Sequence, residues 1–250
     1  MALRTEMVSG WGGAELALHR LGSGRPVILL HGLFSSAEMN WGKWGHAARL
    51  AEAGFEVLMP DLRGHGASAK PHDPAAYPAD VLALDLAALV GALGLVDYDL
   101  VGFSLGSRTA VRGVIGGLAP ARLVLGGMGL EGLAGWGGRK GYFLDVLARF
   151  GTIPPGDPAY LAQQFVRSMA IDRAAAALLL GTMADTPVAA LAALTMPTLV
   201  VCGRDDQDNG SASALTAALP NAVHVEVPGT HMSCVTKPDL GGAIAEFLLT

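Results

Sequence analysis

Short apolar runs alternate along this sequence with longer segments whose apolar residues recur every three or four positions. The runs lie at residues 27–30, 55–59, 100–103, 123–125 and 198–201. Such runs are typical of strands that are buried on both faces of a parallel sheet. Residues 78–93 instead carry leucine at positions 82, 86, 89 and 93, which is the spacing of an amphipathic helix. The alternation therefore predicts a parallel sheet covered by crossover helices.

Two stretches depart from this rhythm. Residues 14–21 alternate apolar and polar and end in a Gly-Ser-Gly turn, which favours an antiparallel hairpin at the edge of the sheet. Between residues 129 and 194, helix-like stretches follow one another with proline and glycine between them, at 142–150, 160–169, 173–183 and 188–194. We interpret residues 129–194 as a helical insertion, and residues 1–128 and 195–250 as the two parts of one α/β core.

Charge and composition limit the partners of this chain. Its formal net charge is −5 and its lysines and arginines form no block, so nothing indicates a nucleic-acid or anionic-membrane partner. The amino end, residues 1–6, lacks a basic start followed by an apolar run, and no stretch approaches the ~20 apolar residues of a membrane span. We therefore expect a cytoplasmic protein without a membrane span. No feature indicates an oligomeric state.

The two cysteines stand in unrelated contexts. Cys202 lies in an apolar run that is predicted to be a strand, and Cys234 follows the last strand-like segment. This arrangement fits neither a disulfide framework nor a four-ligand metal site. We expect two reduced thiols, no bound metal and no cofactor.

The pentapeptide Gly-Phe-Ser-Leu-Gly at residues 102–106 is the first candidate for chemistry. It follows a predicted strand and precedes a helix-like segment at residues 107–115. In that setting, small residues two before and two after a serine allow a sharp turn that exposes its hydroxyl at the carboxyl edge of the sheet. Amides at the start of the helix favour negative charge that develops on a substrate. Ser104 is therefore the predicted nucleophile.

A second motif, His-Gly-Leu-Phe-Ser-Ser at residues 31–36, follows the first predicted parallel strand. The oxyanion of an acyl transfer needs two preorganised N–H donors, one from the residue after the nucleophile and one from this loop. We predict the backbone amides of Leu105 and Leu33 as the two donors, with Phe34 as a competing candidate for the second. His31 itself is interpreted as part of the loop structure.

Of the seven histidines, His231 best fits a general base. It lies on a short Gly-Thr-His turn after the alternating run at residues 223–227, the last predicted strand. From there it can reach a serine at the end of a central strand, since a general base must lie within about 3 Å of the proton it takes. Other histidines are interpreted as structural or as lacking a matching partner: His224, His19, His46 and His72.

The acid that orients this histidine is expected in the loop after residues 198–201. That loop offers Asp205, Asp206 and Asp208, and Glu131 follows the preceding strand. A carboxylate in the loop gives the chain order Ser, Asp, His, which is typical of one class of triad. Any one of these carboxylates could instead cap a turn or a helix, so the residues alone leave the choice open.

Together these residues resemble the α/β-hydrolase superfamily, over nearly the whole chain. Residues 61–68 are similar to the D-x-R-G-x-G-x-S loop of esterases, C–C-bond hydrolases and their relatives. The resemblance implies a mostly parallel, eight-stranded sheet flanked by helices, with the insertion after the sixth strand acting as a lid. It also implies that the acid stands three residues after the glycine that ends its strand, which is Asp206. The proline that the family often has beyond the acid is missing, because residues 207–210 read Gln-Asp-Asn-Gly, so Asp205 stays a candidate.

The resemblance implies a serine hydrolase that cleaves a carboxylic ester of a small, largely apolar substrate through an acyl-enzyme intermediate. Its catalytic residues would be Ser104, Asp206 and His231. A serine nucleophile argues against the dehalogenase and epoxide-hydrolase branches, which form an alkyl-enzyme ester on a carboxylate. C–C-bond hydrolase, lactonase and thioesterase activities on the same triad are the alternatives. A catalytically silent binding module is the alternative from a different class, because one scaffold hosts many functions.

Overall fold

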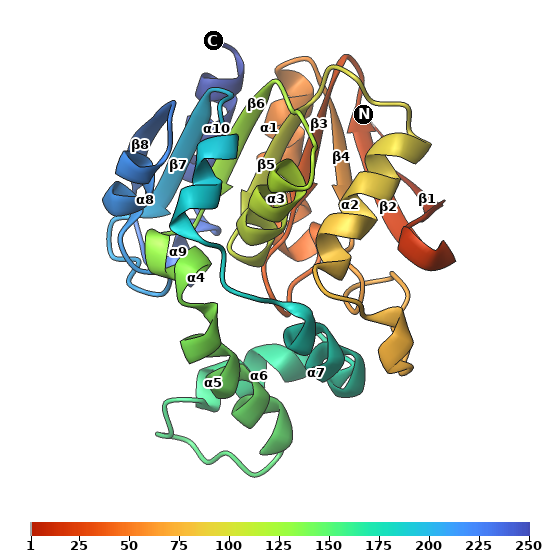
Figure 1. The fold of residues 1–250 in the computed structure, drawn as a ribbon, viewed down its shortest axis with the longest axis vertical. Coiled ribbons are helices and arrows are strands. Elements are labelled where there is room, and N and C mark those ends of the chain that lie inside the picture. Colours follow the sequence, from red (N-terminus) through yellow and green to blue (C-terminus); the bar gives the residue numbers. More distant parts are fainter. Residues whose placement is uncertain (1) are drawn as a thin grey trace.

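A mostly parallel sheet of eight strands forms the centre of the computed structural model (Figure 1). The model describes residues 2–250, so Met1, the first residue of the expected 1–128 core, lies outside the described residues. The strand order is β1-β2-β4-β3-β5-β6-β7-β8. Strand β2 pairs antiparallel with β1 and with β4, and the remaining pairings are parallel. The strands are β1 (Arg4–Ser9), β2 (Glu15–Gly22), β3 (Arg25–Leu30), β4 (Phe55–Pro60), β5 (Asp99–Phe103), β6 (Arg122–Gly126), β7 (Thr198–Gly203) and β8 (Ala222–Val227).

The apolar runs of the sequence lie in the central strands. All residues of β5 and β7 are buried, which explains why these strands read as continuous apolar runs. Strand β8 lies at one edge of the sheet and is largely exposed. Its alternating pattern does not mark a buried apolar face, because Val223 and Val225 are themselves exposed. The expected fold, a mostly parallel eight-stranded sheet with helices on its faces and a helical segment after the sixth strand, is confirmed.

The antiparallel hairpin differs from the one expected around residues 14–24. Residues 15–22 form β2, but the strand joined to it by a tight turn is β1, through the short helix η1 (Trp11–Gly13). The Gly-Ser-Gly turn leads instead into β3, and β4 lies between β2 and β3. Strand β1 has no recognisable pattern because nearly all its residues are exposed. The sheet edge is therefore β1, and β2 lies one strand further in.

Helices cover both faces of the sheet. On one face lie α2 (Val81–Ala92), α3 (Leu105–Ile115) and α8 (Ala212–Ala218), and on the other α1 (His46–Glu52) and α10 (Pro238–Leu248). Because successive strand residues point to opposite faces, Leu100 packs in the first cluster and Val101 in the second. Burying one such side chain fully stabilises the fold by about 1.5–3 kcal/mol. The two clusters hold the sheet rigidly between the helices.

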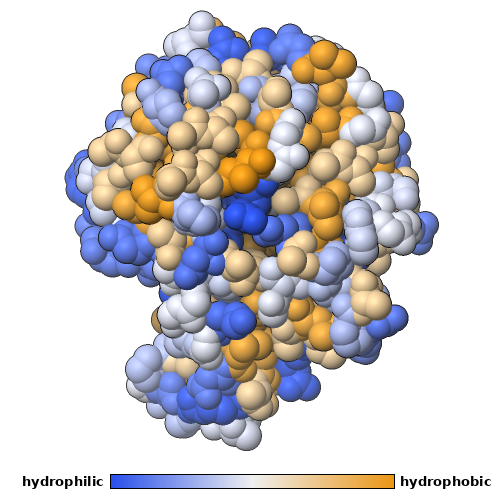
Figure 2. All heavy atoms as spheres, viewed as in Figure 1, coloured by the Kyte–Doolittle hydropathy of each residue, from blue (hydrophilic) through white to orange (hydrophobic). Residues whose placement is uncertain are grey.

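A helical segment (residues 130–193) follows β6, and its last part (residues 188–193) packs on α3 and α8. The middle part of the segment (residues 136–182) lies beyond the carboxyl ends of the strands, at the bottom of Figure 1. It has a hydrophobic cluster of its own, which includes Trp136, Val146 and Val166. Figure 2 shows it as a smaller lobe, with hydrophobic atoms where it joins the larger one. Its elements are α4 (Leu130–Ala134), α5 (Trp136–Ala148), α6 (Tyr160–Ser168), α7 (Arg173–Thr182) and the 3-10 helix η4 (Val188–Ala193).

Two of these elements differ from the expected stretches. Helix α5 starts at Trp136, earlier than the expected residue 142, although glycine at 137, 138 and 141 weakens its helical pattern. Trp136 is buried in the hydrophobic cluster of the segment, so tertiary packing overrides the low propensity. The short helix α4 is the first element after β6 and has no recognisable pattern in the sequence.

A buried arginine of α3 attaches the helical segment to the sheet. The guanidinium of Arg108 donates hydrogen bonds to the carbonyl oxygens of Gly132 and Leu133, near the start of the segment, and to that of Ala184, near its end. Arg108 is 4% exposed. Since burial of a charge is costly unless its donors are satisfied, these carbonyls fix both ends of the segment against α3.

Four further short helices complete the fold: a π-helix η2 (Glu38–Gly42), the 3-10 helices η1 and η3 (Pro74–Ala76), and α9 (His231–Cys234). Cys202 and Cys234 are free and buried, as expected for two unpaired thiols, and burial raises their pKa to about 12 and about 11. Within residues 2–250, no helix combines the length and the apolar character that crossing a membrane demands.

The loop at residues 61–68 is fixed by a buried ion pair. Arg63 is 1% exposed and forms a two-point contact with Asp85 of α2, with N···O distances of 2.9 and 2.6 Å. Its remaining donors bind the carbonyl oxygens of Trp11 and Ala76, at 2.6 and 2.5 Å. The guanidinium therefore ties this loop to α2, η1 and η3 at once.

Replacing Asp85 with asparagine should destabilise the protein by about 3–5 kcal/mol, because removing one partner of a buried ion pair leaves the other charge uncompensated. Urea unfolding at neutral pH measures this loss. Asp145→Asn is the matched control: Asp145 of α5 forms an exposed pair with Arg149, the residue that follows the helix, and such a pair is worth about 0.3–0.5 kcal/mol. Equal losses in the two variants would contradict a structural role for the buried pair.

Candidate active site

Ser104 lies at the sharp turn between β5 and α3. Its backbone has φ 53° and ψ −111°, a conformation that non-glycine residues rarely adopt and that costs of order 1–3 kcal/mol. The amide of Ser104 donates to the carbonyl oxygen of Gly126 on β6, at 2.8 Å, and so secures the turn. The side chain is thereby held at the carboxyl edge of the sheet.

Two glycines make this turn possible. A Cβ on Gly102 would lie 2.3 Å from the backbone of Gly106, and a Cβ on Gly106 would lie 2.1 Å from the carbonyl oxygen of Leu30. Real Cβ atoms do not approach backbone so closely, so both positions require glycine. Helix α3 consequently begins directly after Ser104 and packs close to β3.

His231 is the first residue of the short helix α9. Thr230 caps this helix in a capping box with Ser233: the Ser233 amide donates to the Thr230 hydroxyl and the Thr230 amide to the Ser233 hydroxyl. The imidazole Nε2 lies 3.0 Å from Ser104 Oγ, and the ring packs on that of Phe103, with 5.1 Å between centroids. The end of the last strand thus supplies the base-like partner of the serine.

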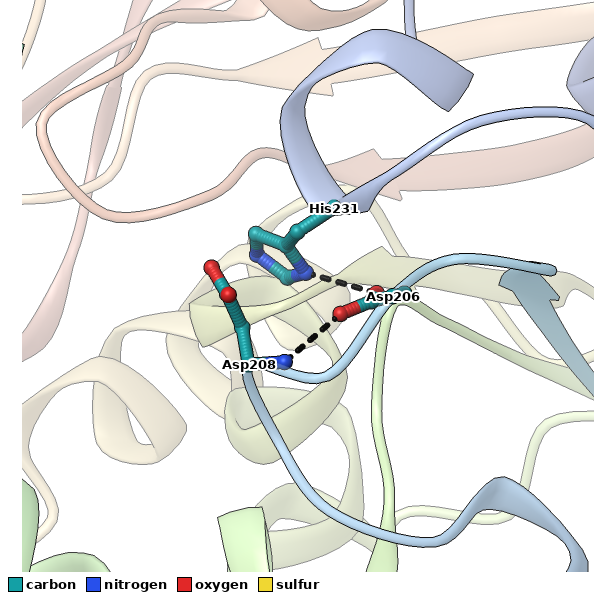
Figure 3. A group of neighbouring side chains, drawn as sticks. All are labelled: Asp206, Asp208 and His231. Carbon is teal, nitrogen blue, oxygen red and sulfur yellow. Dashed lines mark hydrogen bonds and ion pairs between the residues drawn. The ribbon is translucent and has the colours of Figure 1, made fainter.

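Asp206 completes the row of side chains. Its Oδ2 lies 2.8 Å from Nδ1 of His231, and its Oδ1 accepts a hydrogen bond from the amide of Asp208, at 2.9 Å (Figure 3). The loops after β7 and β8 meet closely, since a Cβ on Gly203 would lie 2.3 Å from the carbonyl oxygen of Gly229. Neighbouring parallel strands therefore bring Asp206 and His231 together.

The Asp206 carboxylate stays charged in this setting. Burial acts to raise its pKa, but the hydrogen bond and electrostatic attraction of His231, the amide of Asp208 and the charge of Arg139 together lower that pKa. A charged carboxylate accepts the Nδ1 proton of His231, which leaves Nε2 free to accept the hydroxyl proton of Ser104. This tautomer is the one that proton abstraction from the serine requires.

The competing carboxylates make no hydrogen bond to His231. Asp205 is exposed, and its backbone amide donates a hydrogen bond to the carbonyl oxygen of Gly229. The carboxyl group of Asp208 is drawn near the imidazole in Figure 3 without a hydrogen bond to it. Glu131, on α4, accepts a hydrogen bond from the amide of Ser211. Only Asp206 among the four candidates is hydrogen-bonded to His231.

The candidate oxyanion donors differ in what they already bind. The amide of Phe34 donates to Nε2 of His65, at 3.1 Å. Among the described residues, the amides of Leu33 and Leu105 have no hydrogen-bond acceptor. Phe34 has φ 58°, and its ring packs on Phe143 of α5. Leu33 and Leu105 are therefore the two amides with unused donors.

His31 and His65 form a buried pair behind this loop. Both are fully buried, and their rings meet edge to face with 5.1 Å between centroids. Nδ1 of His31 lies 2.8 Å from the carbonyl oxygen of Gly32, and its Nε2 accepts from the amide of Leu62. Each ring thus has one donating and one accepting nitrogen, which is the neutral form. No structural role for His65 was predicted from the sequence, although it lies within the motif at residues 61–68.

Two further residues shape the loop at residues 31–36, a role that was not predicted for either of them from the sequence. Oδ1 of Asn40 accepts from the amide of Gly32, at 3.0 Å. The carboxylate of Asp61 accepts from the amides of Ala37 and Ala67, both at 2.8 Å. Asp61 is the first residue of the recognised motif, whereas Asn40 lies in a π-helix without any local signature.

Other polar side chains of the sequence analysis lie away from Ser104. His19 contacts Asp61, His46 the carbonyl oxygen of Val235, and His72 the carboxylate of Asp172. His224 is part of β8. Asp206, Asp208 and His231 offer three possible metal-ligand atoms within 4.8 Å of one another. Two of these atoms are already joined to each other by the hydrogen bond between Asp206 and His231.

Comparison with known proteins places this geometry in context. A family model described as alpha/beta hydrolase fold matches residues 25–112. The putative non-heme chloroperoxidase of Synechocystis sp. is 38% identical over 92 residues, which are 37% of this chain and 32% of that protein's own length. This chain therefore spans only a minor part of that curated relative.

Solved structures are similar over nearly the whole chain. A hydrolase from Pseudomonas aeruginosa PA01 superposes with a TM-score of 0.77 at 26% identity, covering 99% of both chains. A thermophilic esterase from Thermogutta terrifontis, solved with malate bound, gives a TM-score of 0.78 at 25% identity, covering 98% of both. The likeness includes the sheet and the helical segment alike.

The buried histidine pair predicts a loss of stability in acid. Burial lowers the pKa of His65 to about 3, whereas an unfolded chain keeps it near 6.5. Below pH 6.5 the unfolded state therefore binds a proton that the folded state does not, and stability falls as the pH falls. Between pH 7 and pH 5 this one group should cost about 2 kcal/mol.

Urea unfolding of the parent and of His65→Gln at both pH values measures this contribution. Glutamine can still accept the amide proton of Phe34 but does not titrate, so the variant should lose about 2 kcal/mol less than the parent on acidification. An equal loss in both proteins would contradict a neutral His65.

Proposed function

Because the chain belongs to the α/β-hydrolase fold superfamily, we propose that it is a serine hydrolase that cleaves carboxylic esters through an acyl-enzyme intermediate. The observation that carries the proposal is the row of hydrogen bonds from Ser104 Oγ through His231 to Asp206, at 3.0 and 2.8 Å. Nucleophile, base and orienting acid need this order of contacts for acyl transfer to a serine.

The reaction follows from the positions of these atoms. Ser104 Oγ attacks the ester carbonyl while Nε2 of His231 takes its proton, and Asp206 stabilises the imidazolium that forms. The amides of Leu33 and Leu105 donate to the oxyanion, where preorganised donors lower the barrier most. His231 then returns the proton to the leaving alcohol. Water, deprotonated by the same imidazole, hydrolyses the acyl-enzyme and regenerates Ser104.

A small, largely apolar substrate fits the surroundings of these groups. Leu33 packs against the main core as well as the hydrophobic cluster of the helical segment. The ring of Phe34, next to it, belongs to that same cluster. An acyl or alcohol group bound near the proposed oxyanion site would thus meet apolar side chains. The likeness to an esterase from Thermogutta terrifontis supports the choice of an ester.

We further propose that residues 129–194 act as a lid on a core made of residues 1–128 and 195–250. The hydrophobic cluster formed mainly by residues 136–180 supports this division. Leu133 and Leu191, near the two ends of the segment, pack instead in the core cluster on the sheet. The attachment through Arg108 lies at the two ends of the segment, as expected for a unit that is held at its base.

Ser104→Ala should reduce ester hydrolysis by several orders of magnitude and leave the far-ultraviolet circular dichroism spectrum unchanged. A panel of p-nitrophenyl esters of increasing acyl length measures turnover, and a fluorophosphonate probe should label the parent at Ser104. Ser9→Ala, at an exposed serine of β1, is the control and should be labelled like the parent. A folded parent that takes no label would instead be a binding module, and preferred turnover of thioesters, lactones or C–C bonds would change the substrate class.

Asp206→Asn should lower turnover by up to roughly 10⁴-fold, because asparagine no longer fixes the productive tautomer of His231. Asp205→Asn, Asp208→Asn and Glu131→Gln should each cost far less, since their carboxylates make no hydrogen bond to the imidazole. Turnover of one activated ester by all four variants checks this ranking. The largest loss at another of these positions would reassign the orienting acid.

A further inference from the structure

The loop that carries Asp206 is held by polar contacts. Gln207 and Asp208 are exposed, and the family's proline is absent from residues 207–210, so neither burial nor a fixed φ restrains this stretch. The amide of Asp206 donates to the carbonyl oxygen of Gly203, at 2.9 Å. The side-chain amide of Asn209 donates to the carbonyl oxygen of Gly127, at 2.7 Å. Whatever else binds this loop will influence where the carboxylate of Asp206 points.

An arginine of the helical segment reaches this loop. Arg139 lies on α5, and its Nη1 donates both to the carbonyl oxygen of Asp208 and to the side-chain oxygen of Asn209. The guanidinium also packs on the ring of Phe143, 5.7 Å from its centroid. One side chain thereby contacts two consecutive residues of the loop and remains anchored on α5.

These contacts continue to the nucleophile without a break. Arg139 binds Asp208 at its carbonyl group, and the amide of Asp208 donates to Oδ1 of Asp206, at 2.9 Å. The other oxygen of Asp206 lies 2.8 Å from Nδ1 of His231. Nε2 of His231 lies 3.0 Å from Ser104 Oγ. The residue that donates to one carboxylate oxygen is thus the same residue that Arg139 holds.

We propose that Arg139 is a positioning residue that orients Asp206 toward His231. The alignment of Asp206 with His231 and Ser104 then depends on the position of α5 relative to the loop that carries Asp206. The inference rests on the proposed serine-hydrolase function and adds a contact that couples the helical segment to it. Arginine suits this task, because Nη1 carries two N–H groups, one for each acceptor, on a guanidinium that stays charged.

The charge of Arg139 acts in the same direction as its hydrogen bonds. Burial opposes ionisation of Asp206, and the positive charge of Arg139 is among the groups that lower the pKa of that carboxyl. Loss of Arg139 would therefore leave Asp206 both less well oriented and less firmly ionised. A different role, direct binding of a negatively charged substrate, would act on substrate affinity rather than on turnover.

A double-mutant cycle on an activated ester tests the proposal. Arg139→Met should lower kcat about tenfold with little change in KM, since one charge-assisted hydrogen bond is worth about that much. In the Asp206→Asn background the same change should have little further effect, because Arg139 acts through Asp206. Arg139→Lys should recover part of the loss. Lys140→Met, which removes one charge from the next position of α5, is the control and should match the parent.

A second measurement follows the hydrogen bond between Asp206 and His231 directly and does not depend on turnover. The proton on Nδ1 of His231 gives a far-downfield resonance in the proton NMR spectrum when it is held by a carboxylate. Arg139→Met should weaken or broaden this resonance, and Lys140→Met should preserve it. An unchanged resonance, a loss of kcat that is additive with Asp206→Asn, or a rise in KM alone would overturn the positioning role. An inactive parent with the expected NMR change would disprove the hydrolase function but not the contact.

Discussion

The backbone of Ser104 is the constraint on which the rest of the site depends. Its positive φ is sustained because β5, β6 and α3 converge there. At Gly102 and Gly106 the neighbouring backbone comes so close that no side chain would fit. Strain of this kind persists only when the surrounding structure determines it several times over. The hydrogen bond from the Ser104 amide to Gly126 and the packing of α3 on β3 provide that support.

A buried polar network gives the neighbouring loops their shape. Asp61, Arg63 and His65 come from one eight-residue stretch, yet each binds a different part of the chain: the start of η2, helix α2 and the amide of Phe34. Every such group pays a desolvation cost, so the network is stable only while its donors and acceptors are paired. Its effect on the site is indirect: by occupying the amide of Phe34, it leaves the amide of Leu33 as the unused donor.

The helical segment is connected to the core by two arginines of different character. Arg108 is buried and holds the two ends of the segment through carbonyl oxygens. Arg139 lies nearer the surface and binds the loop of the candidate acid. Arg108 thus fixes the helical segment near its two ends, while Arg139 connects α5 to the loop that carries Asp206. A displacement of α5 would thus shift Asp206, because residues 207–210 contain no proline that would hold the loop in place.

Local patterns in the sequence determined the buried strands, the turn around Ser104 and the position of His231 at the end of the last strand. These features could be predicted because strand burial, a glycine-flanked turn and chain order are each encoded within a few neighbouring residues. The tertiary structure alone decided the hairpin partner of β2, since the exposed residues of β1 carry no alternation. It also decided which aspartate meets the imidazole, because neighbouring side chains on a loop point in directions set by contacts from elsewhere. Arg139 reaches its two acceptors across 69 and 70 positions of chain, and no local pattern encodes such a contact.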